Sequence, residues 1–110
     1  MSTTNRPDAA AKQGFHEIAE AERLIEQAEQ DPNAARLAAI AALRGLLLYW
    51  GEEPRGQTVR ELLDQAARTD GTLADFQVPA SDLDARSDEI DAVERAKIFL
   101  DAARGRLTGD

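Results

Sequence analysis

Residues 34–63 read AARLAAIAALRGLLLYWGEEPRGQTVRELL, and this stretch decides the fold. As far as Trp50 it is apolar at almost every position, and its only charges there are Arg36 and Arg44. A helix that is apolar nearly all round is buried on several sides. We therefore expect residues 32–50 to form the central helix of the protein.

The segment that follows carries signals for the end of one helix and the start of another. Gly51 suits the left-handed conformation that ends many helices. Thr58 and Glu61 have the spacing of a capping box, in which each side chain accepts a hydrogen bond from a free backbone N–H. Apolar residues then recur at helical spacing, namely Val59, Leu62, Leu63, Ala66 and Ala67. This pattern predicts a shorter helix that ends near Thr69.

The flanking sequence predicts two further long helices. Residues 7–30 place apolar side chains at spacings of three and four, which predicts a helix with one buried face, formed by Phe15, Ile18, Ala21, Leu24, Ile25 and Ala28. Residues 72–76 predict one extra helical turn, and residues 77–86, which include Pro79, predict a loop. The last helix is predicted to begin at Ser87 or Asp88 and to run to about Leu107. We therefore predict an all-α domain spanning residues 1–110, an antiparallel up-and-down four-helix bundle with frayed ends at 1–6 and 108–110.

Composition excludes several classes of protein. The chain has 110 residues, 13 basic and 21 acidic, for a net charge of −8, and it has no cysteine. Disulfides and thiolate zinc sites are therefore excluded, and the acidity argues against broad binding to nucleic acid or anionic membranes. Since no apolar run approaches the ~18 residues of a membrane span, and the first residues form no apolar signal core, we expect a cytoplasmic protein.

The central helix is predicted to carry more apolar surface than one small core can cover. Gly45 in its interior costs about 1 kcal/mol relative to alanine, which the close approach of another backbone would explain. We expect this helix to mediate a homodimer or another protein contact, because aromatic and aliphatic side chains anchor interfaces. The candidate contacts are Leu37, Ala41, Gly45, Leu48, Tyr49 and Trp50.

A second candidate site is an anion or nucleotide site. Four arginines lie on or beside the second and third predicted helices, namely Arg36, Arg44, Arg55 and Arg60. With the free N–H groups that open the third helix, they could hold a phosphate. His16 is the only histidine, so we expect no metal site, no cofactor and no catalytic residue.

The order LLLYWGEEP, a short basic spacer and VRELL resembles the HEPN domain family (higher eukaryotes and prokaryotes nucleotide-binding). The resemblance implies a helical bundle that is usually a homodimer, found as ribonucleases, as companions of small nucleotidyltransferases and as non-catalytic interaction modules. Catalytic members use an arginine followed four to six residues later by histidine. This chain lacks that pair, and Gln57 stands where many relatives have histidine before the third helix.

These observations favour a non-catalytic HEPN-like interaction or regulatory module, homodimeric, with a nucleotidyltransferase or another protein as partner. The alternative is a degenerate ribonuclease or nucleotide-binding protein that uses the four arginines.

Overall fold

The computed structural model describes residues 5–31, 33–85 and 91–107, and over these residues it contains helices and no strand. The α-helices are α1 (Asn5–Ala28), α2 (Asn33–Tyr49), α3 (Val59–Thr69), α4 (Gln77–Ala85) and α5 (Ala92–Leu107). A 3₁₀-helix, η2 (Gly71–Phe76), joins α3 to α4. The predicted all-α class is therefore confirmed.

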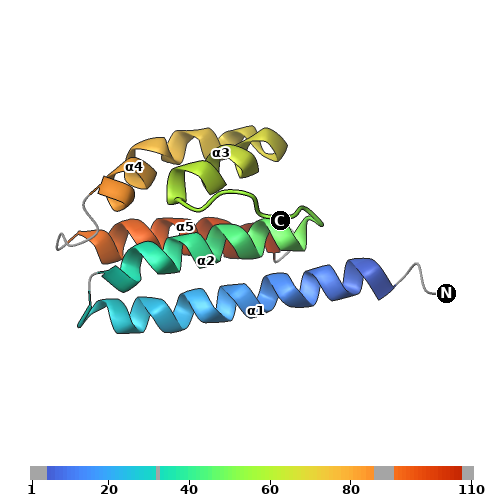
Figure 1. Cartoon of the computed structure of the whole chain (residues 1–110), viewed down its shortest axis with the longest axis horizontal. Helices are drawn as coiled ribbons and strands as arrows, with labels where there is room; N and C mark the ends of the chain where they lie inside the picture. Colours follow the sequence, from blue (N-terminus) through green and yellow to red (C-terminus); the bar gives the residue numbers. More distant parts are fainter. Residues whose placement is uncertain (1–4, 32, 86–90, 108–110) are drawn as a thin grey trace.

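The helices form three layers in a molecule of 49 × 26 × 24 Å. In Figure 1, α1 lies below, α2 and α5 lie side by side in the middle, and α3 and α4 lie above. The helix α2 packs against α1, α3, α4 and α5, which makes it the central element that the sequence predicts.

Residues 77–85 form α4, so the predicted loop is wrong and the described residues contain five α-helices where we predicted four. Pro79 is only the third residue of α4, and N–H groups in the first turn need no acceptor within the helix. Gln77 already has helical angles, φ −64 and ψ −36, so the chain passes directly from η2 into α4. The predicted helix start at Ser87 or Asp88 lies outside the described residues, as do 1–4 and 108–110 of the ends predicted to fray. Residues 5 and 6 belong to α1.

The predicted helix boundaries around α2 and α3 are confirmed by their hydrogen bonds. Gly51 has φ 81, and the N–H of Glu52 donates to the carbonyl of Leu47 at 2.9 Å. This geometry is the Schellman motif that closes a helix. At the start of α3, Thr58 Oγ1 accepts from the Glu61 N–H at 3.1 Å, and Glu61 Oε1 accepts from the Thr58 N–H at 3.2 Å.

The helices α1 and α2 cross closely at two glycines. A Cβ added to Gly45 would lie 2.8 Å from the carbonyl oxygen of Gly14, and one added to Gly14 would lie 2.7 Å from that of Gly45. The close approach predicted at Gly45 is therefore real, and the second backbone belongs to α1 of the same chain. Phe15, by contrast, is predicted to be buried but is 50% exposed.

Candidate functional site

One side of α2 carries apolar side chains that no other helix covers completely. Leu37, Ile40, Arg44 and Leu48 follow one another at spacings of three and four, so they share one face of the helix. Leu37 is 41% exposed, and the other three are half-buried. We call these four residues the α2 stripe.

An ion pair joins the α2 stripe to α1. Arg44 Nε donates to Glu17 Oε1 at 3.1 Å, which ties the stripe to α1. The half-buried Leu24 lies seven residues after Glu17, on the same face of α1, and it extends the apolar surface across the two helices. The whole of α2 contains two arginines and no acidic residue, and Glu17 of α1 pairs with one of these arginines.

The six interface candidates do not form one surface. Leu37 and Leu48 belong to the α2 stripe, whereas Ala41 and Gly45 are buried inside the chain. Tyr49 is half-buried and makes an edge-to-face contact with Phe15, with ring centroids 5.7 Å apart. Trp50 is half-buried and packs against the core.

The N-terminus of α3, predicted to offer free N–H groups to an anion, is already occupied by a side chain of α4. Asp84 Oδ1 accepts from the Val59 N–H and Asp84 Oδ2 accepts from the Arg60 N–H, both at 3.0 Å. Thr58 Oγ1 accepts a hydrogen bond from the next N–H of the helix, that of Glu61. The first three N–H groups of α3 are therefore all bound within the chain, and the expectation of free donors is wrong.

The four arginine candidates are distributed over separate parts of the molecule. Arg44 pairs with Glu17, and Arg36 lies near the start of α2. Arg60 lines a shallow hollow beside α4, whereas Arg55 lines two hollows between the α2–α3 connection and α3. Arg68 joins Arg55 in both of those hollows. Glu61 and Asp64 also line the first hollow, and Glu52 and Glu53 line the second. The surroundings of Arg55 are therefore mixed in charge.

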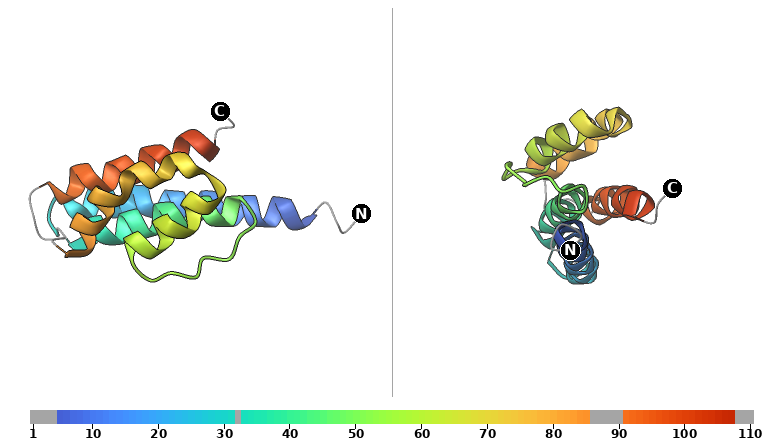
Figure 2. Two further views of the ribbon diagram at one scale, coloured as in Figure 1. Left: turned by 90° about the horizontal axis from the view of Figure 1, so that it is seen from above. Right: turned by 90° about the vertical axis from the view of Figure 1, so that its right-hand side faces the viewer.

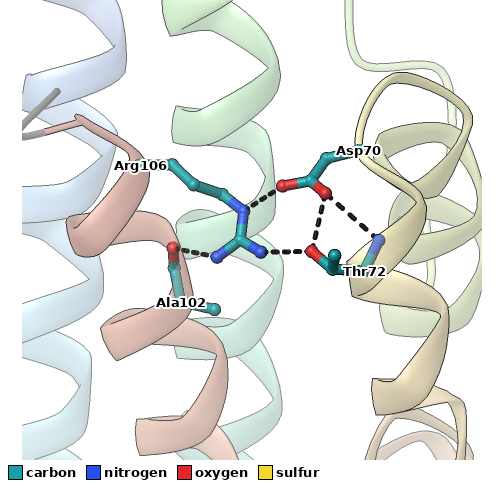
Figure 3. Close-up of polar contacts among 4 residues, drawn as sticks. All are labelled: Asp70, Thr72, Ala102 and Arg106. Carbon is teal, nitrogen blue, oxygen red and sulfur yellow. Dashed lines mark hydrogen bonds and ion pairs between the residues drawn. The ribbon is translucent and has the colours of Figure 1, made fainter. Parts of the chain in front are cut away.

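A polar cluster, missed in the sequence, fastens the end of α5 to η2 (Figure 3). Arg106 Nε donates to Asp70 Oδ2 at 2.5 Å, and Arg106 Nη2 donates to Thr72 Oγ1 at 2.8 Å. Hydrogen bonds from Thr72, together with those from Arg106, lower the pKa of the Asp70 carboxyl. These hydrogen bonds hold the end of α5 against Asp70 and η2. A cationic residue in the last turn of α5 was the only sequence signal for this cluster.

The structure exposes two further large apolar side chains, neither of which we singled out in the sequence. Val78 on α4 is 71% exposed and Ile98 on α5 is 40% exposed. Val78 was missed because its segment was predicted to be a loop. Ile98 was missed because it lies off the regularly spaced apolar positions of the last helix.

The described residues contain no group of three or more histidine, cysteine or carboxylate side chains placed to hold a metal ion. Within the same residues, no helix has both the length and the apolar character that crossing a membrane requires. Comparisons with models of known protein families, with curated proteins and with solved structures found no match to this chain.

Proposed function

We propose that this domain is a protein-interaction module that binds a second copy of itself through the α2 stripe. The observation that carries the proposal is the exposure of Leu37, in line with the half-buried Ile40 and Leu48, on a helix that is otherwise enclosed by four others. Each square ångström of apolar surface removed from water contributes about 25 cal/mol, so burying the α2 stripe against a partner is favourable.

The stripe can supply the centre of an interface but not all of it. From Leu37 to Leu48 the helix rises about 17 Å, so the stripe offers on the order of 200 Å². A stable interface needs about 800 Å² from each partner. The neighbouring face of α1 must then contribute the rim, and the 49 × 26 Å side of the molecule is large enough to do so.

One charge of α2 can contact an acidic group of a second copy. The chain carries a net charge of −8, yet the charges on α2 are Arg36 and Arg44. Arg44 is paired with Glu17, so Arg36 is the cation of α2 that can contact a carboxylate of another molecule of this chain.

A more specific proposal is that the domain is a homodimeric, HEPN-like helical bundle that assists a small nucleotidyltransferase. It rests on the sequence resemblance. The alternative, a degenerate ribonuclease or nucleotide-binding protein, depends on the dispersed arginines. Since Asp84 fills the N-terminus of α3, we expect calorimetric titration with ATP to give no binding heat.

The proposal is tested by measuring the mass of the protein in solution over the micromolar to millimolar range by sedimentation equilibrium. Wild-type protein is expected to associate, and Leu37→Glu is expected to weaken association at least about tenfold, because it places a carboxylate in an apolar contact. The matched control is Ala19→Glu, which adds the same group at an exposed position of α1. A wild-type protein that stays monomeric throughout this range contradicts the proposal.

A further inference from the structure

We draw no further inference here: the strongest candidate, the exposed apolar surface at Val78 on α4 and Ile98 on α5, two helices that lie side by side in Figure 2, carries nothing because no feature of the structure shows what covers it.

Discussion

The carboxylate of Asp84 is expected to be a main support of the α3–α4 half of the molecule. It accepts the N–H groups of Val59 and Arg60 from 25 and 24 residues away, so it joins the start of α3 to the end of α4. Hydrogen bonds to a charged group contribute about 1.5–3 kcal/mol, and leaving a buried N–H without an acceptor costs about 1–3 kcal/mol. Val59 is fully buried, so its N–H is poorly placed to find water after the carboxylate is removed.

Asp84→Ala is therefore expected to lower the free energy of unfolding by about 2–3 kcal/mol. Asp84→Asn keeps one oxygen acceptor but loses the charge that favours a helix N-terminus, and it is expected to cost about 1 kcal/mol. Urea unfolding followed by circular dichroism measures both changes. At an m-value of about 1–3 kcal/mol per molar urea, Asp84→Ala moves the midpoint by on the order of 1–2 M.

The control is Asp75→Ala, which removes an exposed carboxylate from the preceding 3₁₀-helix and is expected to change stability by less than about 0.5 kcal/mol. Hydrogen exchange gives a local readout, because the amides of Val59 and Arg60 are expected to lose protection in Asp84→Ala. If Asp84→Ala matches the control and both amides stay protected, the assignment of Asp84 as the cap of α3 is wrong.

Three further predictions follow from packing and charge. Gly45→Ala is expected to destabilise the protein by about 1–2 kcal/mol in thermal unfolding, because the added Cβ meets the α1 backbone. Gly105→Ala, whose Cβ meets no atom within 4 Å, is expected to raise the melting temperature. Equal effects of the two substitutions would contradict the close crossing of α1 and α2. The lowered pKa of Asp70 contributes stability that is present above the unfolded pKa of 3.8 and is lost as the pH falls through the folded pKa. Asp70→Asn is therefore expected to have a lower urea midpoint than the wild type at pH 7, and this difference is expected to shrink in acid. In urea unfolding, Phe99→Ala is expected to lower the free energy of unfolding by about 3–5 kcal/mol and Phe15→Ala by about 1–2 kcal/mol, because the Phe99 ring is fully buried and the Phe15 ring is half exposed. Similar losses in the two variants would mean that Phe15 is buried in solution.

The features that the sequence predicts correctly depend on residues close together in the chain. The capping box of Thr58 and Glu61 spans four residues, and the end of α2 is set by Gly51 within one turn. Such signals are local because the donors and acceptors lie in the same turn of helix. The class, the central helix and the boundaries of α3 could therefore be predicted.

The features that the sequence does not predict depend on contacts made by distant segments. Asp84 reads as one of many exposed carboxylates until the fold brings it to α3, 25 residues earlier. The same holds for Arg106, whose hydrogen-bond partner Asp70 lies 36 residues earlier in the chain. The helix α4 was missed for a different reason, because Pro79 is a poor guide when it falls in the first turn of a helix.

The alanine content of α2 explains why its apolar composition overstates the surface left for a partner. Alanine and glycine let helices approach closely, and the Gly14–Gly45 crossing shows how closely α1 lies on α2. Six residues of α2 are alanine, and all six are buried between helices of the same chain, so most of the apolar length of α2 is used internally. The apolar surface left over lies at the larger side chains of Leu37, Ile40 and Leu48, which point away from that crossing. Any partner of α2 must therefore bind this narrow line, so a substitution at Leu37 tests association, whereas a substitution at Gly45 tests the fold.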